Sequence, residues 1–285
     1  MSSIKSLRSL FINQLTPLYD PIEAQSLTDM AFTDVLGMVR HQLIIHQNEE
    51  INKEKKSKLE EILERLKKHE PIQYVLGHTD FFGCDILVNP SVLIPRPETE
   101  ELVDLILRDF ADKKNKPLAI ADYCTGSGCI AVALKKHLKQ ATITALDISE
   151  QALETAISNA QHNHCQGIEF ILSDVLGPTY PLNPLDILVS NPPYVTQSEK
   201  KLMQNNVLLF EPSIALFVSD SNPLVFYRKI ADDGLINLKV GGLIYFECNR
   251  KHAKEVLHLL VEKGYRDVEL IEDMNRNHRF IKGKK

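Results

Sequence analysis

The chain has 285 residues, of which 44% are hydrophobic and 25% charged, and its length favours two domains over one. Its net charge of −5 argues against a protein that binds nucleic acid through its overall field, because phosphate-driven binding needs clustered Lys and Arg. Residues 1–97 carry 11 basic against 13 acidic side chains, so the first third of the chain is not a basic arm.

Three stretches with apolar residues at helical spacing occupy the first 70 residues. They cover residues 7–15, residues 22–46 with Gly37 as a candidate break, and a segment from about residue 52 to residue 70, which Pro71 ends. The charges along the third stretch are mixed in sign, which is typical of a solvated helix face. We therefore expect a small all-α domain over residues 1–72.

The segment of residues 74–88 follows, in which Gly77 and Gly83 flank a short β-prone stretch that predicts a hairpin. Residues 73–97 are accordingly expected to connect two domains. The segment that comes next begins a helix at Pro97, since proline suits the first helical position and the acids after it favour the positive end of the helix dipole.

From residue 117 onward, short apolar runs alternate with amphipathic helices. This alternation predicts an α/β domain with a mostly parallel sheet that carries helices on both faces. The last two strands have no helix between them, which predicts an antiparallel edge. The expected helices are 128–139, 149–162, 224–240 and 251–263, and the seven expected strands are 118–123, 142–147, 168–173, 186–190, 243–248, 267–271 and 279–282.

A glycine-containing loop follows the first of these strands, with the sequence Thr-Gly-Ser-Gly from Thr125 to Gly128. Its glycines let the backbone approach a ligand beyond the carboxyl ends of the strands. The same glycines would also suit a plain structural turn. A plain turn is less favoured because each of the first three expected strands of this domain has an acid at or near its carboxyl end, namely Asp122, Asp147 and Asp174. Asp147 is placed to accept from ribose hydroxyls and Asp174 from an adenine amino group, so the pattern predicts an adenosine-type cofactor.

The fourth strand ends in the tetrapeptide Asn191-Pro192-Pro193-Tyr194. Two prolines remove two backbone donors, so the main chain offers carbonyl acceptors, while Asn191 adds a side-chain acceptor and Tyr194 an aromatic face. These groups suit a planar –NH₂ group, whose two hydrogens need two acceptors. A strand-capping turn is the structural alternative, but the position beside the cofactor loop favours an amino-group receptor that acts by positioning and electrostatics.

Cysteine spacing and apolar runs exclude several classes. The five cysteines show no Cys-x-x-Cys pair, which indicates reduced thiols without a disulfide framework or a metal site. No apolar run approaches the roughly 20 residues that cross a bilayer. The first 19 residues scatter polar side chains where a secretory signal would be apolar. We expect a cytoplasmic protein with no membrane contact and no metal.

The loop and the tetrapeptide together resemble those of the class I amino-methyltransferases, which bind S-adenosylmethionine. Within that class, residues 74–77, 93–100 and 210–212 are similar to those of the release factor glutamine methyltransferases. The resemblance runs from about residue 71 to the C-terminus. It implies a seven-stranded Rossmann-like catalytic domain over residues 98–285, a helical domain that docks the release factor, and the glutamine of a Gly-Gly-Gln motif as substrate. A monomer without a nucleic-acid partner is expected.

Site residues are carried over by position from the resemblance. The substrate amide would be held by Asn191, Pro192, Pro193 and Tyr194. Residues 97–99 would close over the cofactor. The cofactor would be lined by Cys124, Thr125, Gly126, Ser127, Gly128, Asp147, Asp174, Val175 and Asn191.

The chain departs from the family pattern at three places. Cys124 stands where glycine is usual. Glu247-Cys-Asn249 replaces an acid followed by an apolar residue and glycine. Residues 273–279 differ in sequence from the usual motif. These departures bear on cofactor affinity and loop geometry, but the reaction class stays the same. Cys124 is interpreted as a small apolar lining residue, since a redox-active thiol needs an electropositive setting.

Two other functions compete with this interpretation. A nucleic-acid adenine or guanine N-methyltransferase uses a similar tetrapeptide on a flipped base, but it would want a basic target-binding surface. A non-catalytic module that binds the release factor or the ribosome would need neither Asn191 nor Asp147. The sequence therefore favours the glutamine methyltransferase.

Overall fold

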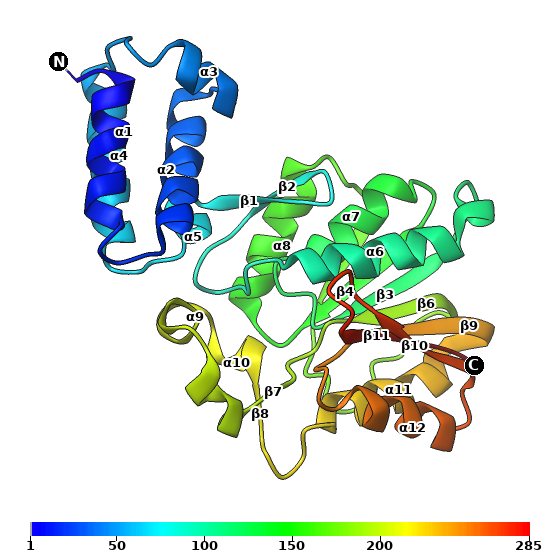
Figure 1. Cartoon of the computed structure of the whole chain (residues 1–285). Coiled ribbons are helices and arrows are strands. Elements are labelled where there is room, and N and C mark those ends of the chain that lie inside the picture. Colours follow the sequence, from blue (N-terminus) through cyan, green and yellow to red (C-terminus); the bar gives the residue numbers. More distant parts are fainter. Residues whose placement is uncertain (1) are drawn as a thin grey trace. The chain divides into compact units, whose positions relative to one another are not determined.

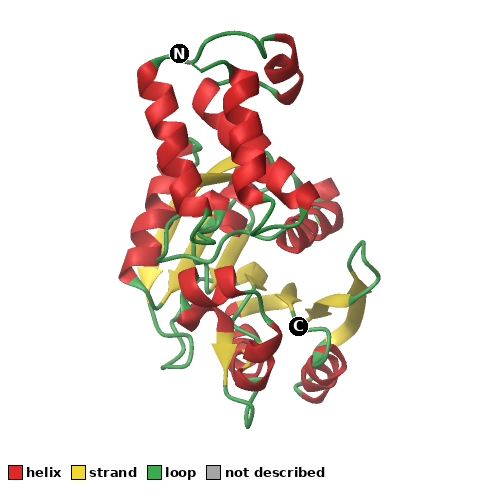
Figure 2. Ribbon diagram, turned by 60° about the vertical axis from the view of Figure 1, so that its left-hand side comes forward, coloured by secondary structure: helices red, strands yellow, loops and turns green. Residues whose placement is uncertain are grey.

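The computed structural model describes residues 2–285 and divides into two compact units (Figure 1). The first unit runs to Gly77 and includes Gln204–Phe210, and the second contains His78–Met203 and Glu211–Lys285. All the strands that the structure describes belong to the second unit; Figure 2 draws them in yellow. Within residues 2–285, no helix combines the length and the apolar character that crossing a membrane requires.

The first unit is built from helices, as the periodicity predicts. The Asn52 side chain caps α4 by accepting from the Lys55 N–H, and Gly37 ends α2 in the left-handed conformation at φ 68°. The expected stretch 22–46 is therefore two helices, and the expected stretch to residue 70 stops earlier, at Leu66. The helices are α1 (Ile4–Leu15), α2 (Pro21–Leu36), α3 (Arg40–Ile45), α4 (Lys53–Leu66), α5 (Ile72–Leu76) and α9 (Asn205–Phe210).

A hairpin opens the second unit, with β1 (His78–Phe81) antiparallel to β2 (Cys84–Leu87). This confirms the hairpin that Gly77 and Gly83 predict. The residues before it, 74–76, form the end of α5, and the chain turns at Gly77 with φ 87°. The hairpin is fixed to α8 (Glu150–His162) by the buried Asn159, whose amide oxygen accepts from the Leu87 N–H at 2.6 Å.

The second unit contains the expected seven-stranded sheet, in the order β10-β11-β9-β6-β3-β4-β5. The five strands from β9 to β5 are parallel, while β11 runs antiparallel to both β9 and β10, as the missing crossover helix predicts. The strands are β3 (Ala119–Tyr123), β4 (Thr142–Asp147), β5 (Ile168–Leu172), β6 (Leu185–Ser190), β9 (Leu238–Glu247), β10 (Arg266–Glu272) and β11 (His278–Lys284).

Helices cover both faces of this sheet (Figure 1). On one face lie α6 (Pro97–Asp109), α7 (Cys129–His137) and α8, and on the other lie α11 (Val225–Asn237) and α12 (Ala253–Glu262). The helix expected over residues 224–240 ends at Asn237, because Leu238 pairs with Leu185 of β6 and begins β9. Strand pairing overrides local helix propensity there.

The broken region after Tyr194 contains short elements only. These are β7 (Val195–Thr196), a 3₁₀ helix (Gln197–Leu202), α10 (Ser213–Leu216) and β8 (Phe217–Val218). The two short strands pair in parallel, so the segments on either side of this insertion lie next to each other. The insertion follows the carboxyl end of β6, where the tetrapeptide lies.

Candidate active site

A cavity of about 290 Å³ lies within the second unit, at the carboxyl ends of β3, β4, β5 and β6. Loops beyond the strand ends form its walls, at the edge of the sheet where open α/β folds bind their ligands. Eight of the nine residues expected to line a cofactor line this cavity: Cys124, Thr125, Gly126, Ser127, Asp147, Asp174, Val175 and Asn191. The ninth, Gly128, does not line it and instead precedes the first residue of α7.

The loop between β3 and α7 is shaped by its backbone. The Thr125 N–H donates to the Leu146 carbonyl at 3.0 Å and the Gly128 N–H to the Thr125 carbonyl at 2.9 Å. A Cβ atom at Gly128 would lie 2.9 Å from the Cβ of Ala156 in α8, so only glycine lets α7 begin this close to α8. The loop is thereby held against a helix that packs on the sheet.

Cys124 opens this loop in the left-handed region, at φ 60°. A side chain in that conformation costs about 1–2 kcal/mol relative to glycine. Burial raises the pKa of the Cys124 thiol well above its ordinary value, which keeps it protonated and unreactive. The thiol therefore acts as a lining group, as the sequence predicts.

Asp147 ends β4 and uses both of its carboxylate oxygens. Its Oδ2 accepts from the Gly126 N–H at 2.8 Å and its Oδ1 from the Ser149 N–H at 3.0 Å. A carboxylate has about four acceptor positions, so two remain for a ligand. Burial raises the pKa of Asp147, and the backbone donors oppose that shift by stabilising the charged form.

Asp122, the first of the three acids, has a different role from the other two. It is fully buried and does not line the cavity. Its Oδ2 accepts from the Thr125 hydroxyl at 2.6 Å, so it supports the loop from beneath. Burial raises its pKa to about 7. Two of the three strand-end acids, Asp147 and Asp174, therefore line the cavity, and the third, Asp122, supports the loop from within the core.

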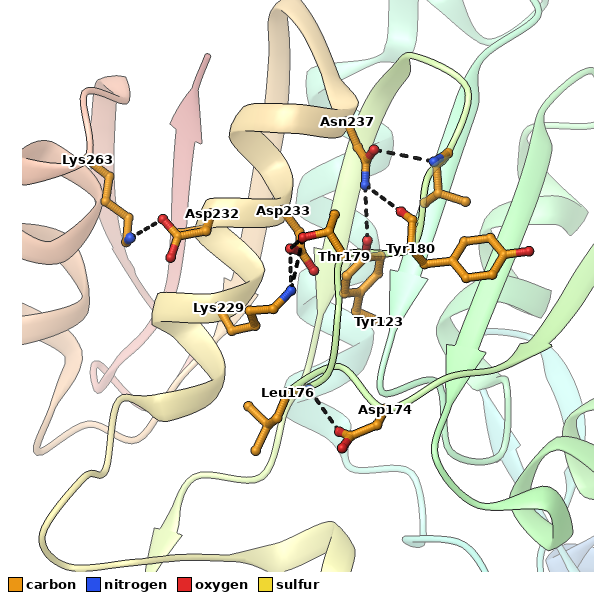
Figure 3. A network of polar contacts seen from close by, with 12 residues as sticks. Tyr123, Asp174, Leu176, Thr179, Tyr180, Lys229, Asp232, Asp233, Asn237 and Lys263 are labelled. Carbon is orange, nitrogen blue, oxygen red and sulfur yellow. Dashed lines mark hydrogen bonds and ion pairs between the residues drawn. The ribbon is translucent and has the colours of Figure 1, made fainter.

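Asp174 and Val175 follow β5 and also line the cavity. Asp174 is exposed, and its Oδ1 accepts from the Leu176 N–H at 2.8 Å (Figure 3). Side chains of α11 brace the chain that comes next. The Thr179 hydroxyl donates to Asp233 at 2.6 Å, and the amide of Asn237 donates to the Tyr180 carbonyl at 3.1 Å (Figure 3).

The tetrapeptide is divided between the cavity and the core. Asn191 and Pro193 line the cavity, whereas Pro192 is buried and Tyr194 is not among the lining residues. The Tyr194 hydroxyl instead donates to Glu247 Oε1 at 3.1 Å. The Asn191 amide Nδ2 donates to the Thr99 hydroxyl at 3.1 Å, which leaves its Oδ1 without a hydrogen-bond partner among residues 2–285.

Thr99 and Glu247 take part in the site in ways that the sequence does not predict: Thr99 contacts Asn191, and Glu247 is not among the expected site residues. Thr99, expected to close over the cofactor, lines the cavity with Arg96, whereas Pro97 and Glu98 do not. Glu247 is buried at the carboxyl end of β9. The signal that could have found it is an acid at the end of a fifth parallel strand, beside the other strand-end acids.

Two of the segments that resemble the family, residues 93–100 and 210–212, are joined by an ion pair. Glu211 is buried and pairs with Arg96, and its Oε2 accepts from the Ile94 N–H at 3.2 Å. This contact fixes the loop before α6 to the insertion after β6, so both contribute to the cavity wall. The apolar lining residues Ile148, Ile214 and Phe226 carry no recognisable motif.

The chemistry available in the cavity is that of hydrogen-bond acceptors and apolar contacts. Asp147 and Asp174 line the cavity with carboxylates, and Asn191 lines it with an amide group. Among residues 2–285, no group of three or more His, Cys, Asp or Glu side chains has a metal-binding arrangement. An adenosine group and a planar amino group are the ligand chemistries that fit these groups.

Comparison with known families gives two matches along the chain. Residues 101–255 match the family model described as the methyltransferase small domain, which is more than half of the chain. Residues 12–77 match the model described as the PrmC N-terminal domain.

Curated relatives cover almost the whole sequence. A release factor glutamine methyltransferase of Bacteroides thetaiotaomicron is 41% identical over 94% of this chain and 95% of its own length. The protein of the same name from Flavobacterium psychrophilum is 41% identical over 98% of both chains. That of Streptococcus pneumoniae is 40% identical over 82% of this chain and 79% of its own.

Among solved structures, a methyltransferase of Pyrococcus furiosus has a similar fold. It superposes with a TM-score of 0.51 at 18% identity, over 72% of this chain and 90% of the other. At that identity the likeness concerns the fold alone.

Proposed function

This chain belongs to the release factor glutamine methyltransferase family, and from that membership we propose that it methylates the side-chain amide nitrogen of a glutamine in peptide-chain release factors. The methyl donor is S-adenosylmethionine, and the target is the glutamine of a Gly-Gly-Gln motif. One observation carries the proposal: the amide of Asn191 lines the same cavity as Asp147 and the loop that begins at Cys124.

The residues of the cavity fit the donor. Asp147 keeps two acceptor positions for the ribose hydroxyls, and Asp174 is exposed to the cavity for the adenine amino group. Val175 and Ile148 provide apolar contact for the adenine ring. When bound, S-adenosylmethionine would supply an electrophilic methyl group on a sulfonium sulfur. As the amide nitrogen bonds to this methyl, the sulfur–carbon bond would break and leave its electron pair on sulfur as a neutral thioether, and the nitrogen would lose one proton to solvent.

The remaining contribution of the chain is to hold the glutamine amide. Its lone pair is delocalised, so the nitrogen is a poor nucleophile until both of its hydrogens are engaged by acceptors. The Oδ1 of Asn191 is one such acceptor, and the main-chain carbonyls of the Pro192–Pro193 segment supply the other. These acceptors strengthen as the nitrogen gains positive charge, which favours the transition state over the ground state.

The parts of the chain have separate roles in this proposal. Residues 1–72 dock the release factor, residues 73–97 connect, and residues 98–285 carry out the transfer. Nucleic acid has no part in the reaction, and the protein acts as a monomer in the cytoplasm.

Labelled methyl transfer to purified release factor tests the proposal directly. The wild-type release factor should gain label, and a release factor in which the Gly-Gly-Gln glutamine is replaced by alanine should not. Label that survives protease but is released by nuclease would indicate a nucleic-acid methyltransferase instead. If neither protein nor nucleic acid gained label, the chain would instead be a non-catalytic binding module.

A further inference from the structure

A buried chain of hydrogen bonds runs from Asn191 into the core of the second unit. The Asn191 Nδ2 group donates to the Thr99 hydroxyl at 3.1 Å, and that hydroxyl donates to Glu247 Oε2 at 2.7 Å. The other oxygen of Glu247 accepts from the Tyr194 hydroxyl at 3.1 Å. Thr99 is 3% exposed and Glu247 1%, so water does not compete for these bonds.

The direction of these hydrogen bonds follows from which atoms of Asn191, Thr99 and Glu247 can donate and which can accept. An ionised carboxylate only accepts, so the single hydroxyl proton of Thr99 must point to Glu247. The hydroxyl then has only lone pairs to offer Asn191. If the Asn191 amide were rotated by 180°, its oxygen would face the Thr99 oxygen and two acceptors would meet in a buried site. The orientation with Nδ2 toward Thr99 is therefore selected, and Oδ1 is turned away from it.

We propose that Thr99 and Glu247 are positioning residues that lock the Asn191 amide in the orientation that presents Oδ1 to the glutamine –NH₂ group. This inference rests on the proposed function and adds two residues to it. The reversed amide would present a second –NH₂ group to the substrate, where donor meets donor and the side-chain acceptor is lost. Glu247 also holds Tyr194, so one carboxylate fixes both ends of the tetrapeptide.

The groups around Glu247 decide how readily it ionises and so accepts hydrogen bonds from Thr99 and Tyr194. Burial raises the pKa of Glu247, and Glu98 of α6 acts in the same direction. The Thr99 and Tyr194 hydroxyls and Arg279 of β11 oppose this rise by favouring the carboxylate form. Arg279 itself lies within 3.5 Å of Asp273 and donates to the Cys248 carbonyl at 3.3 Å. The carboxylate therefore has one cationic neighbour and two hydroxyl donors, which supports its role as the acceptor that ends the chain.

The substitution Thr99→Val removes the hydroxyl and keeps the shape of the side chain. With release factor and S-adenosylmethionine both saturating, kcat should fall roughly 10- to 100-fold, as expected for the loss of a group that orients a reacting one. The KM for release factor and the Kd for S-adenosylmethionine should change less than threefold. Thr99→Ser retains the hydroxyl and should restore most of kcat.

Thr179→Val is the matched control. Thr179 also has a hydroxyl that donates to a buried carboxylate, Asp233, and accepts from a nitrogen, Lys229, but it does not line the cavity (Figure 3). It should lower the melting temperature about as much as Thr99→Val while leaving kcat within twofold of the wild type. A similar loss of kcat in both variants would show that Thr99 acts through stability alone and would overturn the proposal.

Two further outcomes decide the matter. A Thr99→Val enzyme with wild-type kcat, or one whose defect lies entirely in cofactor Kd, would overturn the positioning role while the glutamine transfer of the wild type stands. A wild-type enzyme that never labels the release factor would instead remove the proposed function, so the two failures are distinguishable.

Discussion

Two groups of residues that line the cavity are held in place in different ways. We call the group around Cys124 and Asp147 the cofactor end and the group around Asn191 the amide end. At the cofactor end, the loop from Cys124 is held by backbone N–H groups and by Asp147, which lies 21 positions from its partner Gly126. At the amide end, Asn191 depends on Thr99, 92 positions away, which depends in turn on Glu247, 148 positions away. Backbone geometry shapes the first end, whereas side chains from three separate elements shape the second. Substitutions at the amide end should therefore alter rate, and those at the cofactor end should alter affinity and stability.

The largest effect is expected at the amide end, from Asn191→Ala. Its kcat should fall by roughly 10²–10³, comparable to the loss of one oxyanion-hole donor, because the acceptor that strengthens in the transition state is gone. Cofactor affinity, measured by calorimetry, should fall much less than kcat. A variant that transfers methyl at the wild-type rate under saturating substrates would remove Asn191 from the mechanism.

At the cofactor end, Asp147→Ala should weaken S-adenosylmethionine binding by about 1.5–3 kcal/mol, since a charged acceptor for the ribose is lost. Asp147→Asn is the matched control, because it keeps one acceptor oxygen and should lose less. Calorimetry on all three proteins gives the comparison. If affinity is unchanged in the alanine variant, the ribose is held elsewhere.

The free energy of unfolding should depend on pH through Asp122, which supports the loop that begins at Cys124. Its folded-state pKa of about 7 lies above the ordinary value of 3.8, so the folded protein holds this proton more tightly than the unfolded chain does. The contribution to stability is therefore fully present below pH 3.8, declines as pH rises, and is lost above about pH 7. Asp122→Asn removes this dependence.

The two proteins should diverge when their free energies of unfolding are measured in urea at several pH values. Relative to Asp122→Asn, the wild type should lose about 3 kcal/mol between pH 5 and pH 8, because stability falls by about 1.36 kcal/mol for each pH unit up to the folded-state pKa of about 7. Parallel stability curves would mean that Asp122 ionises without penalty.

The smallest effect is expected from Cys124→Gly. Glycine relieves the left-handed backbone but adds freedom to the unfolded chain, so the free energy of unfolding should rise by only about 0.5–1 kcal/mol. Cys124→Ala keeps the Cβ atom and the strain and should not gain. A glycine variant less stable than the alanine variant would indicate that the Cys124 thiol contributes packing that outweighs the strain.

Much of the sheet could be predicted because its signals are local. The strand that ends at Tyr123 and the strand from Thr142 to Asp147 are buried in the middle of a parallel sheet and appear as apolar runs at their observed positions. The boundary at Asn237 could not be predicted, since Leu238 becomes a strand residue only through its pairing with Leu185. The insertion after Tyr194 was likewise beyond local patterns, because its two short strands gain stability only from each other.

The candidate site divides along the same line. The sequence by itself determined the glycine loop, the ligand-facing acids Asp147 and Asp174, and the tetrapeptide, because each occupies a strand end whose position follows from periodicity. Only the tertiary structure decided that Asp122 is a buried support and that Tyr194 turns to Glu247. It alone brought Thr99 to Asn191. The physical reason is that a hydrogen bond between distant elements depends on how helices and strands pack, and no periodicity along the chain records that packing.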